Sequence, residues 1–220
     1  MDELHPKRRK ISASSTQTRT TTRHFDKADC FVLIVGSERR EILVHANYMA
    51  QESEVFKDWL TEKGFIPNMN TLVLPNIDHA TMTDYITFAY IEKLPTAHLV
   101  GPVCETFTGD EYLSLAHLYF LGERFQNQTL KQATLAEIRR ISTLLDIDTV
   151  ATFPGLEDIH TIYRGTCKGD PARRLMVEMI AEGGSGQWLT PECNQSFILD
   201  LARKLLNRGR EPLQFPRRSM

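Results

Sequence analysis

The apolar run over residues 30–35 most constrains what this 220-residue chain can fold into. It reads CFVLIV, is apolar on both faces and stops at Gly36-Ser37. A short continuous run bounded by turn residues is typical of a buried strand. A second short strand is expected over residues 40–44, which makes a hairpin the simplest interpretation.

Two short helices and a third strand are expected next. Between His45 and Thr61, apolar side chains recur near helical spacing, and Ser53 can cap the second of the two helices. A strand is expected over residues 71–74, followed by a longer helix that begins after Asp78. Three short strands cannot bury both faces of a sheet, so the helices must complete the core. The pattern therefore predicts an α/β fold of the α+β kind, with a small three-stranded sheet flanked by helical hairpins.

The rest of the sequence predicts an all-helical C-terminal part. A loop marked by Gly and Pro precedes a helix that Asp110 can cap, and a helix pair is expected across Gly122. Pro154-Gly155 then breaks the chain. Beyond this break the spacing predicts three amphipathic helices, over residues 157–163, 171–181 and 191–206.

Both ends of the chain are expected to be flexible tails. Residues 1–25 are rich in Ser, Thr, Lys and Arg and contain almost no large apolar side chains, so they cannot offset the entropy of ordering. Residues 211–220 are interpreted in the same way. A cluster of four cations in the first tail resembles a nuclear import signal: Lys7, Arg8, Arg9 and Lys10. A solvated basic tail accounts for this cluster equally well, so both interpretations stay open.

Composition and charge exclude several classes of protein. With 41% hydrophobic and 25% charged residues, the chain has the composition of a soluble globular protein. Its formal net charge of -2 gives no overall electrostatic reason to bind nucleic acid. No run of about 18 apolar residues is present to cross a membrane. We therefore expect an intracellular protein, in the nucleus, the cytoplasm or both, with no direct nucleic-acid or membrane partner.

The motifs of common enzymes and cofactor sites are missing from the sequence. There is no phosphate-binding loop, no dinucleotide fingerprint and no zinc-protease motif. Residues 183–187 read GGSGQ and depart from the G-x-S-x-G motif of serine hydrolases at the last position, where this chain has Gln187. The cysteines lie too far apart for a metal site, and His45 is interpreted as a structural hydrogen-bonding residue. We expect a non-enzymatic protein with no catalytic residue, metal or cofactor.

A series of short motifs occurs in a fixed order over residues 26–140. Residues 29–36 read DCFVLIVG and residues 42–45 read ILVH; a serine-x-x-phenylalanine segment, an LVLP strand and a helix ending in tyrosine follow. This order and spacing resembles that of BTB/POZ domains. The family pattern falls on Asp29, Gly36, His45, Ser53, Phe56 and Tyr90. Two later segments, within residues 141–210, more loosely resemble the helical C-terminal extension of small fungal members of the family: residues 173–175 and 197–202.

The resemblance implies a function in protein–protein association. BTB/POZ domains often self-associate through the first helix and neighbouring surfaces, so a homodimeric adaptor or scaffold with protein partners is expected. In several branches the domain docks to a cullin-type ubiquitin ligase. As a substrate adaptor of such a ligase, the chain would recruit the target through residues 141–206. A nuclear transcriptional regulator that acts through partners is a third alternative, motivated by the basic tail.

Two departures from the family pattern bear on the partner. Cullin-binding members commonly have a hydrophobic-x-glutamate motif in the loop before the third strand. This chain has no acidic residue in that loop, whose residues are Gly64, Phe65, Ile66 and Pro67. Leu60-Thr61-Glu62 has the right form but lies too early, at an expected helix end. In the transcription-factor branch a basic residue follows the histidine, where this chain has Ala46. The loop over residues 64–67 remains a candidate partner-binding loop.

Overall fold

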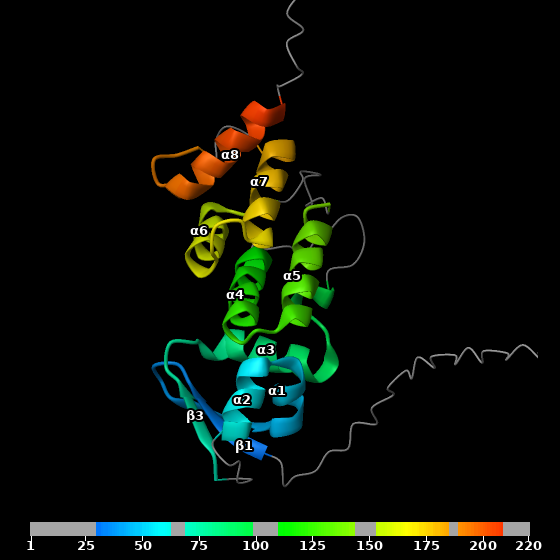
Figure 1. Ribbon diagram of the computed structural model, residues 1–220, viewed down its shortest axis with the longest axis vertical. Helices are drawn as coiled ribbons and strands as arrows, with labels where there is room; N and C mark the ends of the chain where they lie inside the picture. Colours follow the sequence, from blue (N-terminus) through cyan, green and yellow to red (C-terminus); the bar gives the residue numbers. More distant parts are fainter. Residues whose placement is uncertain (1–29, 63–68, 99–109, 144–152, 185–188, 209–220) are drawn as a thin grey trace, which may run out of the picture.

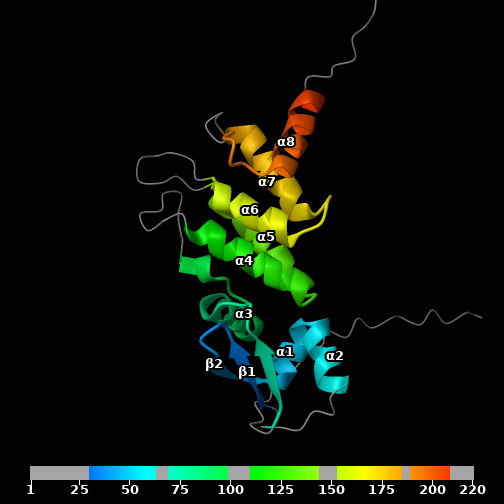
Figure 2. The same cartoon turned by 90° about the vertical axis from the view of Figure 1, so that its left-hand side faces the viewer.

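The computed structural model of the protein describes residues 30–62, 69–98, 110–143, 153–184 and 189–208. These residues form an elongated arrangement, with the sheet at one end and the last helix at the other (Figure 1). The turned view shows α1 and α2 beside the sheet, and α3, α4, α5 and α6 between the sheet and the pair α7 and α8 (Figure 2). A small sheet with a mostly helical C-terminal part confirms the predicted fold class.

Three strands form the sheet in the order β2-β1-β3, with the bounds β1 Cys30–Val35, β2 Arg40–His45 and β3 Thr71–Leu74. Strands β1 and β2 pair antiparallel, with Val32 opposite Leu43, and β3 lies parallel to β1. The turn between β1 and β2 begins at Gly36, whose φ of +70° lies in the left-handed region that favours glycine. The three predicted strands are confirmed, and β2 includes one more residue than expected.

The described ranges also contain eight α-helices and one short 3-10 helix. Their bounds are α1 Ala46–Glu52, α2 Glu54–Glu62, α3 His79–Ile91, η2 Pro95–His98, α4 Asp110–Arg124, α5 Gln128–Ile141, α6 Leu156–Gly165, α7 Pro171–Gly183 and α8 Gln195–Arg208. The predicted cap Asp78 accepts a hydrogen bond from the Thr81 N–H at 2.8 Å. Asn127 and Asp170 cap α5 and α7 in the same way. Side-chain caps therefore mark where these helices begin.

Helix α4 belongs to two hydrophobic cores at once. Leu118 and Leu121 pack with the inner face of the sheet and with α1, α2 and α3. Tyr112 and Tyr119, on another face of α4, pack with α6, α7 and α8. The Tyr119 hydroxyl also donates to Asp170 Oδ1 at 2.8 Å, which connects α4 to the cap of α7. Helices α6, α7 and α8 therefore pack on the same helix, α4, that also completes the core of the sheet and of α1, α2 and α3.

The structure corrects the position of one predicted turn. Gly122 does not separate a helix pair: it is buried within α4, which continues to Arg124, and the chain turns at Phe125 and Gln126. A Cβ atom on Gly122 would lie 2.8 Å from Cγ of Lys131 on α5. Glycine is needed here because α4 and α5 approach each other closely, and not because the backbone turns.

The last helix begins later than its spacing predicts. Pro191, the expected start, lies in a turn, and α8 begins only at Gln195. The Asn194 side chain accepts hydrogen bonds from the N–H groups of Ser196 at 3.0 Å and Phe197 at 3.3 Å, so Asn194 is the N-cap. The expected start was wrong because proline suits a turn as well as a first helical turn. The helices expected over residues 157–163 and 171–181 are confirmed as α6 and α7.

Candidate protein interaction surfaces

A hydrogen-bonded aromatic cluster fixes the end of β2. The Tyr90 hydroxyl on α3 accepts a hydrogen bond from the backbone N–H of His45 at 2.9 Å and lies 2.8 Å from His45 Nδ1. The Tyr48 ring on α1 stacks on Tyr90 with ring centroids 4.7 Å apart. Burial raises the pKa of Tyr90, so its hydroxyl stays protonated and can donate to Nδ1. His45 therefore connects the sheet to α1 and α3, which is a structural role.

A second junction connects the turn between α1 and α2 to the end of α4. Ser53 is buried, and its Oγ donates to the Phe125 carbonyl at 2.6 Å and accepts from the Phe56 N–H at 3.2 Å. The Phe125 ring lies against Phe56, with centroids 4.7 Å apart, and against Tyr85, with centroids 5.1 Å apart. Ser53 and Phe56 therefore hold the first helical hairpin against α3 and the end of α4.

The side of the sheet that faces away from the helices carries four neighbouring apolar side chains beside the polar Glu41 and Thr71. We call these four the outer sheet face: Val32, Ile34, Leu43 and Val73. The strand register places Val32 opposite Leu43 and Ile34 opposite Val73, so the four side chains are neighbours. Leu43 is 65% exposed and Val73 44% exposed. Contiguous exposed apolar side chains on a rigid sheet are typical of a surface for protein contact.

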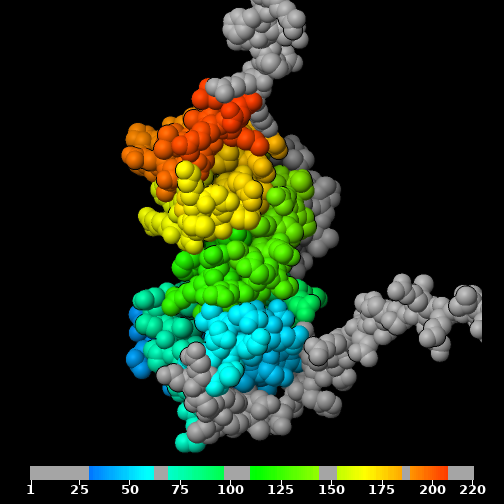
Figure 3. All heavy atoms as spheres, in the orientation of Figure 1, coloured from blue at the N-terminus to red at the C-terminus, as the bar shows by residue number. Residues whose placement is uncertain are grey.

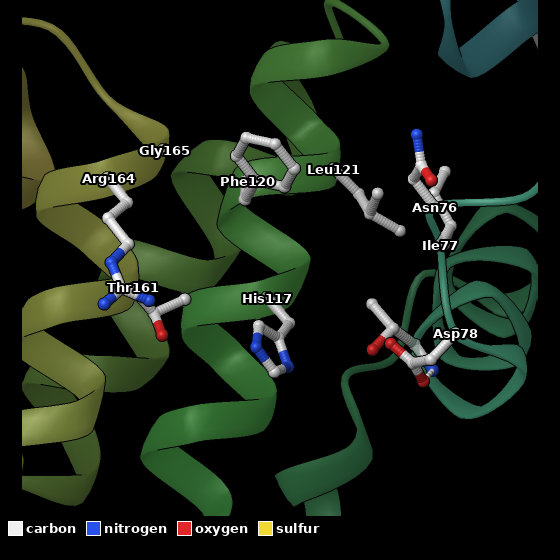
Figure 4. Close-up of a pocket in the computed structure, with 10 residues that line it drawn as sticks. Asn76, Ile77, Asp78, His117, Phe120, Leu121, Thr161, Arg164 and Gly165 are labelled. Carbon is white, nitrogen blue, oxygen red and sulfur yellow. Dashed lines mark hydrogen bonds between the residues drawn. The ribbon is translucent and has the colours of Figure 1, made fainter. Parts of the chain in front are cut away.

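A cleft lies where the first core meets the C-terminal helices (Figure 4). Its volume is about 340 Å³, and its walls come from the turn before α3, from α4 and from α6. Figure 4 shows His117, Phe120 and Leu121 of α4 between Asp78 on one side and Arg164 on the other. The Phe120 side chain is 38% exposed. The cleft therefore combines an apolar floor with an acid, a base and a histidine.

The charges of this cleft suit binding. Burial by itself would raise the pKa of Asp78, but the hydrogen bonds from Thr81 and the nearby His117 outweigh it, so the pKa lies below its ordinary value. The Asp78 carboxylate is consequently charged at neutral pH, and Arg164 supplies the opposite charge across α4. The arrangement can hold an apolar side chain of a partner between charges of both signs.

The structure does not bring the residues predicted from the family pattern into one surface. Gly36 lies in the turn after β1, His45 and Tyr90 share one cluster, and Ser53 and Phe56 share another. Leu60-Thr61-Glu62 lies at the end of α2, as expected. Several predicted residues lie outside the described residues: Asp29, the basic cluster Lys7, Arg8, Arg9 and Lys10, and the loop Gly64, Phe65, Ile66 and Pro67.

Sequence reasoning missed both the outer sheet face and the cleft. For the sheet a signal was present, because side chains alternate between the two faces of a strand and Leu43 is apolar on the side opposite Val44. For the cleft no local signal exists. Asp78, His117 and Arg164 are far apart in the sequence, and only the packing of α4 against α3 and α6 brings them together.

Within the ranges that the structure covers, no group of three or more His, Cys, Asp or Glu side chains could hold a metal ion. Among the helices of the described part of the chain, none has the length and apolarity needed to cross a membrane. Cys30, Cys167 and Cys193 are free thiols.

Comparison with protein families identifies a similarity. A family model described as BTB/POZ domain matches residues 22–142, which is more than half of the chain. The match covers the sheet and the helices from α1 to α5. A search of curated proteins finds no match to this chain.

Proposed function

We propose that this chain, which belongs to the BTB/POZ domain family, works as an adaptor that brings proteins together and associates with a second copy of itself. Domains of this family are protein–protein interaction modules, and they often dimerise. The observation that carries the proposal is the outer sheet face, where Leu43 and Val73 are exposed beside the half-buried Val32 and Ile34.

Burial of the outer sheet face would supply the driving force for self-association. Full burial of a Leu or Val side chain stabilises by roughly 1.5–3 kcal/mol. In a two-fold symmetric contact both copies bury the same positions, so the exposed Leu43 and Val73 of each copy contribute most and the half-buried Val32 and Ile34 contribute less. Two sheets can stack face to face about 10 Å apart with their side chains interdigitated. The polar neighbours Glu41 and Thr71 would then form part of the rim.

The surface of the first helix is a weaker candidate for the same contact. The resemblance to BTB/POZ domains implies contact through this helix, which is α1. In this chain the side chains that α1 exposes are polar, Asn47 and Gln51, while its apolar residues Tyr48 and Met49 are buried in the molecule. The outer sheet face therefore offers more apolar area than α1 does.

An adaptor needs surfaces that stay free when it self-associates. The sheet lies at one end of the molecule and α8 at the other (Figure 1). Figure 3 shows the same separation in space-filling form, with blue and cyan atoms at one end and red atoms at the other. A dimer formed through the sheet would leave α6, α7 and α8 of both copies open to other proteins.

Light scattering across a dilution series of the full chain tests this proposal. We expect the mass of a dimer at high concentration and a fall toward the mass of a monomer on dilution. The double variant Leu43→Glu with Val73→Glu should be a monomer throughout, because it places charges in the contact. Both side chains are exposed, so the variant should still fold.

Leu206→Glu is the matched control, because Leu206 is 72% exposed and belongs to α8, the helix at the opposite end of the molecule from the sheet. It should dimerise as the unaltered chain does. A dimer that survives the double variant but is lost in the control would move the contact to α8. A monomer at every concentration of the unaltered chain would reject self-association.

Substrate recruitment for a cullin-type ubiquitin ligase is the second candidate function. The packing of α6, α7 and α8 on α4 favours it, since this places a second helical unit where a target could bind. The sequence of the loop over residues 64–67 is against it, because that loop has no acidic residue. A pull-down with a cullin scaffold separates the two functions. The absence of binding at micromolar concentration would reject the ligase role.

A nuclear regulator that acts through partners is the third candidate. Its basis is the basic cluster over residues 7–10. If the cluster is an import signal, a fluorescently tagged chain should accumulate in the nucleus, and replacement of the four cations by alanine should abolish this. Equal cytoplasmic distribution of both forms would reject the import signal.

A further inference from the structure

The C-terminal helices α7 and α8 enclose a groove whose side chains are mostly cationic. Its volume is about 400 Å³. Five cations line it: Lys168, Arg173, Arg174, Arg203 and Lys204. The carboxylates in the lining are Glu178 and Asp200. Five positive and two negative charges give a local excess of three positive charges, in a chain whose formal net charge is -2.

The two carboxylates are already engaged within the groove. Asp200 Oδ1 forms an ion pair with Arg203 Nη1 at 3.0 Å, and Glu178 Oε1 forms one with Lys204 Nζ at 3.7 Å. Lys168 and Arg174 are exposed, and neither makes an ion pair with another described residue. The groove therefore presents cationic groups that its own acids do not neutralise.

One wall of the groove is held rigid by Arg173. Its guanidinium donates to Thr166 Oγ1 at 3.0 Å and to the Tyr163 carbonyl at 2.7 Å, and it lies 4.5 Å from the centroid of the Tyr163 ring. The Tyr163 hydroxyl in turn donates to Asp200 at 3.3 Å. Burial and the nearby Asp200 raise the pKa of Tyr163, so this hydroxyl remains a donor at neutral pH. A wall that is fixed before binding loses little entropy on binding.

The floor of the groove is apolar. Val177 is only 6% exposed and lies between the cations, whose alkyl stems add apolar surface around it. A ligand that matches this surface needs carboxylates for the cations and an apolar side chain for the floor. An acidic peptide that contains aliphatic residues has both.

Nucleic acid matches the groove less well. Single strands are held by aromatic rings on which bases stack, and none of the described residues that line the groove is aromatic. The basic cluster over residues 7–10 of this chain does not suit the groove as a ligand either, because cluster and groove are both positively charged.

We propose that the groove between α7 and α8 binds an acidic, aliphatic peptide segment of a partner protein. Carboxylates of the peptide pair with Lys168 and Arg174, and an aliphatic side chain lies over Val177. This binding is separate from self-association through the outer sheet face, because the groove and the sheet lie at opposite ends of the molecule.

Fluorescence polarisation with the full chain tests the proposal. The probe is a short labelled peptide of Glu, Asp and Leu, compared with a peptide in which Lys replaces the acids and with a labelled single-stranded oligonucleotide. We expect saturable binding of the acidic peptide alone, and weaker binding as salt is raised. The double variant Lys168→Glu with Arg174→Glu should weaken this binding by at least about tenfold, since two attractions become repulsions.

The same charge change elsewhere provides the control. Arg124→Glu with Arg139→Glu alters two exposed arginines on α4 and α5, outside the groove, and should leave peptide binding unchanged. The groove variant should fold, because a glutamate at position 174 lies near the N-terminus of α7, where acids are favourable. Equal binding by the groove variant and the unaltered chain, or no binding by the unaltered chain, would overturn the proposal. Tighter binding of the oligonucleotide, lost in the groove variant, would overturn it in favour of nucleic acid.

Discussion

Ser53 shows how one small side chain can hold distant parts of the fold together. Its Oγ connects the start of α2 to the Phe125 carbonyl, 72 residues further along the chain. Ser53→Ala leaves that carbonyl and the Phe56 N–H without this partner in a buried place. We expect the free energy of unfolding in urea to fall by about 1–3 kcal/mol. Ser142→Ala, at the exposed end of α5, should change it by less than about 0.5 kcal/mol. Similar losses in both variants would contradict the role given to Ser53.

Asp158 makes stability depend on pH. Burial raises the pKa of Asp158 to about 6; the hydrogen bond from the Gly155 N–H opposes this rise, and the carboxylates of Glu157 and Asp110 add to it. The folded state therefore holds the proton more tightly than the unfolded chain, whose value is near 3.8. This stabilisation is fully present below about pH 4 and is lost as pH rises through about 6.

Asp158→Asn should flatten this part of the pH profile. Each pKa unit corresponds to about 1.4 kcal/mol. As pH rises from about 4 to above about 6, titration of Asp158 should therefore lower the free energy of unfolding by up to about 3 kcal/mol. Asparagine does not titrate, and its carbonyl oxygen can still accept from the Gly155 N–H. Urea unfolding at several pH values, compared between the two proteins, measures the difference. Parallel profiles would show that Asp158 does not titrate in this window.

At the scale of elements, the sharing of α4 by two cores has a measurable consequence. We propose the limits 26–140 for the domain, 141–210 for its helical extension and 1–25 and 211–220 for the tails. A chain that ends after residue 142 would lose α6, α7 and α8 and expose Tyr112, Leu115 and Tyr119 on α4. We expect it to melt at a lower temperature and to bind an apolar dye.

A chain that ends after residue 208 is the control for this truncation, because it retains every described residue. It should melt with the full chain and bind no additional dye. If the chain that ends after residue 142 had the same melting temperature as the full chain, the first core would be stable without the extension. The packing of α6, α7 and α8 on α4 would then not stabilise the first core.

The elements also show what the sequence could and could not predict. Strands β1 to β3 and the caps Ser53 and Asp78 were predictable, because their signals are local. Gly122 was misinterpreted, since a glycine needed for close helix packing looks in the sequence like one needed for a turn. The two faces of α4 and the groove of α7 and α8 depend on contacts between distant segments, so no local pattern contained them.

At the scale of the whole molecule, the candidate surfaces lie at different places along one long axis. The outer sheet face is at one end, the cleft beside Phe120 lies where the two cores meet, and the groove lies between α7 and α8 near the other end (Figure 1). Contact at one end therefore does not obstruct the other. This arrangement suits a protein that joins a second copy of itself to a different partner.

Self-association of the whole molecule should also appear in its thermal stability. A contact that forms only between folded chains stabilises the folded state by mass action, so the melting temperature should rise with protein concentration. The variant Leu43→Glu with Val73→Glu should melt at one temperature at all concentrations, whereas Leu206→Glu should keep the dependence. Differential scanning calorimetry over a concentration series measures this. If the unaltered chain melted at a constant temperature while light scattering showed a dimer, the unfolded chain would also have to associate, and the outer sheet face could not be the contact.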